Sequence, residues 1–267
     1  MAEHVPFNAT VSGVDRLNEA LIVLRARFDD GSRLNFEPGQ FVNLGLPPWK
    51  DEDPPPKDGL IKRPYSIASA PDAEEIEFFL RLVDDGALTP SLFRLDEGDP
   101  LFIETRPVGK FTLASLPEAP APAERDLVMV STGTGLAPFQ SMLRRFDGQG
   151  LWRRFVMING VRIESDLGYR EELERKHSDD EGFVYLPLCS REPEGGAWRG
   201  LRGRVQEALA PAMYEELVGA PLDPASCQVM LCGNPDMIDT LEADLGERGF
   251  KRHRRKEPGQ LHLERYW

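Results

Sequence analysis

Apolar and polar residues alternate with a period of two through the first part of the chain, with breaks at Gly, Pro and Asp. This period is typical of strands that bury one face. The segments predict an antiparallel six-stranded β-barrel. Its strands are expected at Ala9–Val14, Leu21–Phe28, Gln40–Leu46, Arg63–Ser69, Glu75–Val83 and Pro100–Thr105.

Short apolar runs alternate with helical patterns in the rest of the chain. Strand–helix alternation predicts a parallel sheet wrapped by helices. The strands are expected at Asp126–Ser131, Phe155–Asn159, Phe183–Leu188 and Cys227–Leu231, and the helices at Pro138–Phe146, Gly168–His177, Arg204–Ala210 and Pro235–Arg248.

Two proline-rich stretches interrupt these patterns. Leu116–Ala123 contains three prolines, which continue neither a strand ladder nor a helix. It predicts a linker between a β-barrel domain, residues 1–122, and an α/β domain, residues 123–267. Pro47–Lys62 contains five prolines and no periodicity, so a surface loop is expected there.

The 267-residue chain carries a net charge of −13, which argues against nucleic acid or an anionic membrane as a partner. No apolar run approaches the roughly 18 residues that cross a bilayer, and no secretion signal is evident. We therefore expect a cytoplasmic protein, and a monomer is a separate expectation that these features do not decide. Three irregularly spaced cysteines and four scattered histidines do not form a metal or iron–sulfur motif, so no metal is expected.

One basic cluster, Lys251–Lys256, contrasts with the acidic total. Such a cluster is either a solvated face or a docking patch for an acidic protein. The sequence leaves both interpretations open.

A glycine-rich turn, Thr132-Gly133-Thr134-Gly135, joins the first parallel strand to a helix that begins near Pro138. Glycines let the backbone approach a pyrophosphate, whose charge the free N–H groups of the helix stabilise. The alternative is a tight turn without a ligand, because the full GxGxxG pattern is absent.

Arginines follow the next strands at the same edge of the predicted sheet. They are Arg162 after Gly160-Val161, Arg191 after Cys189-Ser190, and Arg204 after Gly203. In an NAD-binding site, a carboxylate at the end of the second strand usually binds the ribose hydroxyl. An arginine at that position favours the 2′-phosphate of NADP instead. At about 1.5 kcal/mol each, three arginines favour NADPH over NADH by roughly 10³-fold.

The fourth strand runs into Cys232-Gly233-Asn234-Pro235-Asp236. A buried cysteine is usually a small hydrophobe, but the carboxyl end of a parallel strand before a helix is where ligands bind. We therefore interpret this turn as part of the nucleotide site.

The segment Arg63-Pro64-Tyr65-Ser66 suits a flavin, because it combines a cation for phosphate, a ring that can cover the heterocycle, and a hydroxyl for its edge. Asp85–Thr89 offers a further turn, a helix start and a hydroxyl for a second phosphate. The chain ends on Glu264-Arg265-Tyr266-Trp267. One interpretation is that its aromatic pair packs on the barrel as an apolar plug.

Together, RPYS at 63–66, VDDGALT at 83–89, STGTGLAP at 131–138, NGVR at 159–162, SRE at 190–192, MLCGNPDM at 230–237 and the terminal YW resemble the ferredoxin/flavodoxin–NADP reductase family, in particular its bacterial branch. The resemblance covers nearly the whole chain. It implies an FAD-binding β-barrel followed by an NADP(H)-binding α/β domain.

Carried over to this sequence, the family implies two sets of cofactor-binding residues and a third set that assists the reaction. The FAD set is Arg63, Pro64, Tyr65, Ser66, Phe79, Leu80, Arg81, Leu82, Ala87, Leu88, Thr89, Thr132, Tyr266 and Trp267; the NADP set is Gly133, Thr134, Gly135, Val161, Arg162, Ser190, Arg191, Arg204, Cys232, Gly233, Asn234 and Asp236; the catalytic set is Ser66, Cys232 and Glu264.

The resemblance implies electron transfer between NADPH and a ferredoxin or flavodoxin, with hydride passing to the flavin and electrons then leaving singly. The alternative is a reductase component for an oxygenase or a small-molecule acceptor. That alternative would normally bring an iron–sulfur element, for which this chain has no cysteine set.

Overall fold

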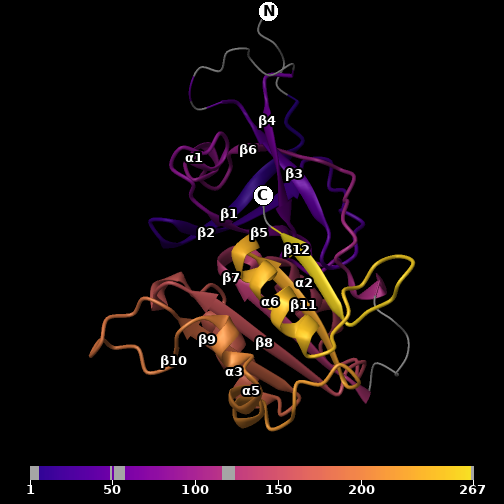
Figure 1. Ribbon diagram of the computed structural model, residues 1–267. Helices are drawn as coiled ribbons and strands as arrows, with labels where there is room; N and C mark the ends of the chain where they lie inside the picture. The colour runs from indigo at the N-terminus through magenta and orange to yellow at the C-terminus, as the bar shows by residue number, and fades with distance from the viewer. Residues whose placement is uncertain (1–5, 49, 51–57, 116–123, 266–267) are drawn as a thin grey trace, which may run out of the picture. The chain divides into compact units, whose positions relative to one another are not determined.

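The computed structural model describes residues 6–48, 50, 58–115 and 124–265, and their contacts divide the chain into two units (Figure 1). The first unit comprises the chain up to Leu113 together with Ala137–Arg145. The second comprises Ala114–Leu136 and the chain from Phe146 onward. The predicted linker, residues 116–123, and residues 49 and 51–57 of the proline-rich loop lie outside the described residues.

The first unit contains a six-stranded sheet in the order β4-β3-β6-β1-β2-β5, and every neighbouring pair is antiparallel. An antiparallel bridge between Ile67 and Phe78 links the ends of this order, which closes the sheet into a barrel. The predicted antiparallel class is therefore confirmed. The elements are β1 (Ala9–Asn18), β2 (Leu21–Phe28), β3 (Phe41–Leu46), β4 (Ile61–Ser66), β5 (Ile76–Arg81), the short helix α1 (Thr89–Leu92) and β6 (Pro100–Ile103).

Strand β4 differs from the prediction at both ends. It begins at Ile61 because Ile61–Ser66 pairs with the whole of β3. Lys62 therefore belongs to the strand, and the proline-rich loop ends earlier than expected. Beyond Ser66 the chain leaves β3, and Ile67 bridges to β5 instead.

Helix α2 (Ala137–Phe146) packs against the barrel through polar as well as apolar contacts. The Ser141 hydroxyl donates to the Ser69 carbonyl at 2.7 Å, and Arg144 Nη1 donates to Glu77 Oε1 at 2.6 Å. Glu77 is only 8% exposed and also lies 3.5 Å from Arg25 Nη1. Two guanidinium groups thus compensate the desolvation of this carboxylate, which fixes α2 to β5.

The second unit is built on a six-stranded sheet in the order β10-β9-β8-β7-β11-β12. All its pairs are parallel, as predicted. Apolar residues of α4, α5 and α6 pack with one face of the central strands in a single core. The elements are β7 (Asp126–Thr132), β8 (Arg154–Val161), α3 (Arg170–Asp179), β9 (Phe183–Cys189), β10 (Leu201–Arg202), α4 (Val205–Ala208), α5 (Pro211–Val218), β11 (Cys227–Gly233), α6 (Pro235–Glu247) and β12 (Leu261–Arg265), with single 3₁₀ turns at Leu113–Ser115, Gly133–Leu136 and Glu164–Asp166.

Three elements of this unit, α5, β10 and β12, are missing from the sequence prediction. The helix expected over Arg204–Ala210 ends at Ala208, and α5 then begins at Pro211. Proline favours an extended residue before it and a helix start at its own position. Gly219, in the left-handed region at φ 74°, ends α5. Strand β12 has no counterpart in the sequence prediction, because its partner β11 lies far away in the sequence.

One smaller correction concerns the start of a helix. Helix α3 begins at Arg170 rather than Gly168, because Tyr169 holds a left-handed conformation at φ 56°. Among the described residues, no helix is both long and apolar enough to cross a bilayer.

Candidate functional site

The parallel sheet reverses its strand order at β7, which lies between β8 and β11. In open α/β sheets, ligands bind outside the carboxyl ends of the strands at such a switch point. Ser131, near the end of β7, pairs with Cys232 of β11. The glycine-rich turn and the Cys232 turn, which are a hundred residues apart in the sequence, therefore start side by side.

Glycine is required at three places in these two turns. Gly133 and Gly233 have φ values of 54° and 136°, which other residues rarely adopt. At Gly135, a Cβ atom would overlap the carbonyl oxygen of Cys232, and at Gly233 it would overlap the Thr132 hydroxyl. The turns thus approach each other through bare backbone, which leaves N–H groups accessible to a phosphate.

Thr132 and Asn234 hold the two turns together. Thr132 Oγ1 accepts a hydrogen bond of 2.9 Å from the Asn234 backbone N–H. The Asn234 side chain caps α6 by accepting from the N–H groups of Asp236, at 2.8 Å, and Met237, at 3.3 Å. Asn234 and Thr132 therefore shape the site, while Asp236 lies exposed in the first turn of the helix.

The predicted arginines meet at the same edge of the sheet, because backbone bonds continue beyond the strand ends. The Ser190 N–H and hydroxyl donate to the Val161 carbonyl at 3.0 and 3.1 Å, and the Arg191 N–H donates to the Arg162 carbonyl at 2.8 Å. Arg202 of β10 pairs with Cys189, which brings Arg204 to this edge two residues later. The sheet thus gathers three arginines that are more than a dozen residues apart in the sequence.

These three arginines are available for a ligand. Arg162, Arg191 and Arg204 are exposed, and none forms an ion pair with a described residue. By contrast, neighbouring Arg202 donates to the carbonyls of Glu192, at 2.8 Å, and Pro193, at 3.2 Å. A dianionic phosphate would compensate the positive charge that the three guanidinium groups bring together.

Sequence reasoning missed the residues that support this edge. The Glu192 carboxylate accepts from the Glu164 backbone N–H, and Arg170 pairs with Glu164 and stacks over Trp198 at 5.2 Å. The buried Trp198 indole donates to the Leu201 carbonyl at 2.9 Å. The loops that carry Arg162 and Arg191 are therefore joined to each other. The only signal in the sequence was a tryptophan among Gly and Arg residues.

Cys232 and Glu264 form the third feature of the second unit. They are register partners on the parallel strands β11 and β12, and the Cys232 thiol donates to Glu264 Oε2 at 3.9 Å. Burial raises the pKa of the Glu264 carboxyl to about 7, and the thiol hydrogen bond opposes this rise. Two predicted catalytic residues are therefore in contact, at the strand ends that carry the glycine turns.

In the first unit, Arg63, Tyr65 and Ser66 lie on β4, at one side of the barrel sheet. Tyr65 packs partly against the barrel core, and burial raises the pKa of its phenol to about 12. Arg63 is exposed, forms no ion pair with a described residue and donates to the Lys62 carbonyl at 2.8 Å. Ser66 is buried. An apolar ring surface and an accessible cation thus lie on one strand.

The remaining flavin candidates of this unit lie on β5 and at the start of α1. Leu80 belongs to the barrel core, so only its backbone is available to a ligand. The Thr89 hydroxyl donates to the Val83 carbonyl at 3.0 Å and accepts from the Val83 N–H at the same distance. It therefore closes the turn that precedes α1, and it is not the accessible phosphate donor that the sequence suggested. Phe79 and Leu88 are buried, and Arg81, Leu82 and Ala87 are partly buried; Tyr266 and Trp267 lie outside the described residues.

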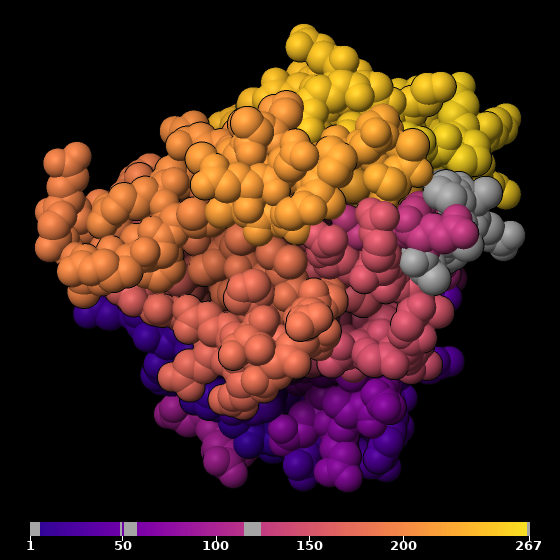
Figure 2. Space-filling view, turned by 90° about the horizontal axis from the view of Figure 1, so that it is seen from below, coloured from indigo at the N-terminus to yellow at the C-terminus, as the bar shows by residue number. Residues whose placement is uncertain are grey.

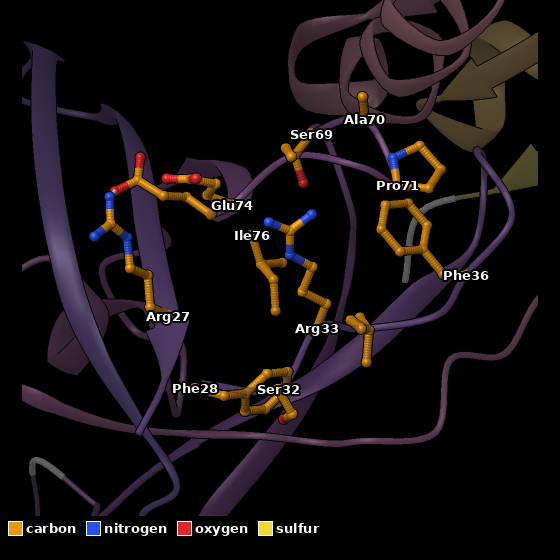
Figure 3. Close-up of a pocket in the computed structure, with 13 residues that line it drawn as sticks. Arg27, Phe28, Ser32, Arg33, Phe36, Ser69, Ala70, Pro71, Glu74 and Ile76 are labelled. Atoms are coloured by element: carbon orange, nitrogen blue, oxygen red, sulfur yellow. Dashed lines mark ion pairs between the residues drawn. The ribbon is translucent and has the colours of Figure 1, made fainter. Parts of the chain in front are cut away.

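A hollow in the first unit does not involve these candidates. Figure 3 shows Arg33 projecting toward Ser69 and Glu74 over the apolar Phe28 and Ile76. None of the flavin-binding candidates that the structure describes lines it. Arg27, at its rim, is paired with Glu75 at 2.9 Å.

Comparison with known proteins identifies the family. Residues 129–243 match the model of the oxidoreductase NAD-binding domain. The ferredoxin–NADP reductase B of Sorangium cellulosum is 37% identical over 268 residues, which cover 100% of both chains. The chain belongs to the ferredoxin–NADP reductase family. The flavodoxin/ferredoxin–NADP reductase of Escherichia coli is 32% identical over 88% of this chain and 89% of its own.

A solved structure of this family supports the fold. This chain matches the crystal structure of a ferredoxin NADP⁺ reductase from Neisseria gonorrhoeae with a TM-score of 0.83 at 27% identity. That structure contains bound FAD and NADP. The match covers 98% of this chain and 99% of that chain. Both units described above are therefore standard parts of a ferredoxin–NADP reductase.

Proposed function

We propose that this protein is an FAD-dependent reductase that transfers electrons between NADPH and a ferredoxin or flavodoxin. The observation that carries the proposal is the contact between Cys232 and Glu264 beside the glycine turns of the switch point. A thiol and a carboxyl with a pKa near neutrality form a polar, proton-holding pair where a nucleotide would bind. The family relatives carry the same activity in their names.

The second unit fits NADPH. The bare backbone around Gly133, Gly135 and Gly233 would accept the pyrophosphate, because side chains are excluded there. Arg162, Arg191 and Arg204 would bind the 2′-phosphate, with the Ser190 hydroxyl nearby. A carboxylate suited to the 2′-hydroxyl of NADH does not follow β8, which ends in Val161 and is followed by Arg162.

The first unit fits FAD. Arg63 would bind a phosphate of the cofactor, Tyr65 would cover the flavin ring, and Ser66 would donate a hydrogen bond to the ring edge. Backbone from Phe79 to Leu82 and the turn at Ala87–Thr89 would complete the site. FAD, when bound, would supply chemistry that no side chain has: uptake of one hydride, which carries two electrons, and release of those electrons one at a time.

The chain's own residues position the reactants and hold a proton. Tyr65 and the barrel would exclude water from a bound flavin, and the glycine turns would orient the nucleotide. Glu264 holds a proton at its carboxyl below about pH 7, and Cys232 keeps that carboxyl in place through its thiol. In the first unit, the Ser66 hydroxyl would donate to, or accept from, the edge of the flavin ring.

The raised pKa of Glu264 predicts a specific pH dependence. Its folded pKa of about 7 lies above the ordinary value of 4.5, so the folded protein binds this proton more tightly than the unfolded chain. The resulting stabilisation is complete below pH 4.5 and is lost as the pH rises through 7. We expect the Tm of the wild type to fall more steeply between pH 5 and 8 than that of Glu264→Gln, and the reductase rate of the wild type to fall in the same window.

Parallel Tm curves for the wild type and Glu264→Gln would show that this carboxyl keeps an ordinary pKa. Cys232→Ser serves as a control, because it preserves a donor to the carboxylate. Cys232→Ser should lose stability over the same pH range as the wild type. Cys232→Ala should lose it at a higher pH, because the hydrogen bond that stabilises the charged Glu264 carboxylate is lost.

The proposed function is tested with purified protein. We expect a yellow protein with bound FAD that reduces ferricyanide with NADPH and then reduces ferredoxin or flavodoxin. Colourless protein that remains inactive after addition of FAD would refute the proposal. Reduction of ferricyanide without reduction of either carrier would favour the small-molecule acceptor instead.

A further inference from the structure

The basic cluster at Lys251–Lys256 is part of a tight hairpin rather than a helix face. The Arg254 N–H donates to the Glu257 carbonyl and the Glu257 N–H donates to the Arg254 carbonyl, both at 2.9 Å. Arg255 and Lys256 therefore form the two-residue tip of the turn. The hairpin is part of the yellow loop that projects beside β12 in Figure 1.

Both legs of the hairpin are attached to the parallel sheet. The His253 N–H donates to the Leu261 carbonyl at 2.8 Å, and the Leu261 N–H donates to the Lys251 carbonyl at 3.0 Å. On the return leg, the Gly259 carbonyl accepts from Gln228 Nε2 of β11 at 3.0 Å. The base of the hairpin thus extends the edge of the sheet beyond β12.

A pair of stacked imidazoles stiffens this base. The rings of His253 and His262 lie 4.3 Å apart at an interplanar angle of 22°, and His262 is 6% exposed on β12. Gly259 lies against the outgoing leg so closely that a Cβ atom would overlap the Lys251 carbonyl. The tip is therefore held in a defined position, which reduces the entropy that a binding partner would have to remove.

The hairpin carries positive charge that the described residues neutralise only in part. Residues 251–257 contain five Lys or Arg and one Glu, a net charge of +4 on a chain whose total is −13. Arg252 pairs with Glu242 at 3.1 Å, and Arg254 lies 3.8 Å from Glu257. Lys251, Arg255 and Lys256 are exposed and form no ion pair with any described residue. This pattern differs from an ordinary solvent-exposed helix face, on which positive and negative side chains usually alternate and form ion pairs.

We propose that this hairpin is the docking element for the acidic electron carrier, with Arg255 and Lys256 at the contact. The inference rests on the proposed function, which supplies a carrier protein as the partner. A small protein with clustered carboxylates complements a compact patch of +4, and the attraction speeds encounter at low salt. The yellow C-terminal segment lies on the molecular surface, where a partner can reach it (Figure 2).

An extended polyanion fits this surface less well. Lipid headgroups and nucleic acid present charge over areas much wider than one turn, so they would also meet the acidic remainder of the chain. With a Debye length of about 8 Å in physiological salt, only a partner with local complementarity gains from the hairpin. The carrier is therefore favoured over a membrane or a nucleic acid.

Charge reversal tests the proposal on the FAD-loaded protein. For Arg255→Glu/Lys256→Glu we expect the KM for a small acidic flavodoxin or ferredoxin to rise about tenfold at low salt. The dependence of its rate on ionic strength should flatten, while ferricyanide reduction by NADPH and the Tm stay at wild-type values. The matched control is Arg33→Glu/Arg175→Glu, which changes the same charge at exposed positions elsewhere and should leave the carrier KM within about twofold.

The outcomes separate the docking element from the function on which it rests. A hairpin variant with unchanged carrier KM and salt dependence, or a control with an equal loss, overturns the proposal. Loss of binding to phosphatidylserine vesicles or to duplex DNA, with carrier kinetics unchanged, overturns it in favour of that other anion. Wild-type protein that reduces neither ferricyanide nor a carrier refutes the proposed function itself.

Discussion

Replacing Arg162, Arg191 and Arg204 together by alanine should lower the preference for NADPH over NADH by about 10³-fold. Each guanidinium would contribute about 1.5 kcal/mol to binding of the 2′-phosphate. NADH lacks this phosphate, so its kinetics should change little. The single variant Arg191→Ala should raise the KM for NADPH by about tenfold.

The measurement is kcat/KM for both nucleotides with ferricyanide as the acceptor. Arg202→Lys is the matched control. Arg202 lies beside the three arginines, but it donates to the Glu192 and Pro193 carbonyls. We expect it to retain the NADPH preference. Equal losses for NADPH and NADH in the triple variant would show that the arginines serve the structure of the edge rather than the 2′-phosphate.

Gly135→Ala is expected to be the most damaging single substitution. The added Cβ would overlap the Cys232 carbonyl, and because this neighbour is backbone, the two turns must move apart. We expect a loss of about 3 kcal/mol in the free energy of unfolding, and a Tm lower by about 6 to 12 °C. Misplacement of the turns by about 1 Å should also lower the NADPH-dependent rate by about 10²-fold.

A second glycine of the same unit provides the control. Gly246 lies in α6, and a Cβ atom built there would meet nothing within 4 Å. Gly246→Ala should leave the rate unchanged and stabilise the helix by up to about 1 kcal/mol. If Gly135→Ala resembled this control in both Tm and rate, the close approach of the two turns would have no functional importance.

The order of strands and helices could be predicted where the pattern is local. Strand β2 was expected at Leu21–Phe28 and is found there, and α6 was misjudged by a single residue at its end. Periodicity reports which face of an element is buried, and that is decided within a few residues. Glycines and arginines at the strand ends were also evident, because parallel strands bring their carboxyl ends to one edge of a sheet.

The roles of individual polar side chains are harder to predict from the sequence. The Thr89 hydroxyl was expected to bind a phosphate, yet it closes a turn with Val83. Asn234 is predicted to bind the nucleotide, and the structure adds that its side-chain oxygen caps α6. A hydroxyl or an amide has several possible partners, and the local sequence does not show which of them the fold will bring into reach.

The sequence alone determined the two kinds of sheet, the two glycine-containing turns and the basic cluster at Lys251–Lys256. Each of these features is visible in residues that are close together in the chain. Tertiary structure decided that β12 lies parallel to β11, which brings Glu264 into contact with Cys232, and that Lys251–Gln260 forms a braced hairpin. Strands β11 and β12 are about thirty residues apart in the chain, and the hairpin is attached to the sheet through Gln228 of β11, which donates to the Gly259 carbonyl. No short-range pattern encodes such pairings, so only the folded chain reveals them.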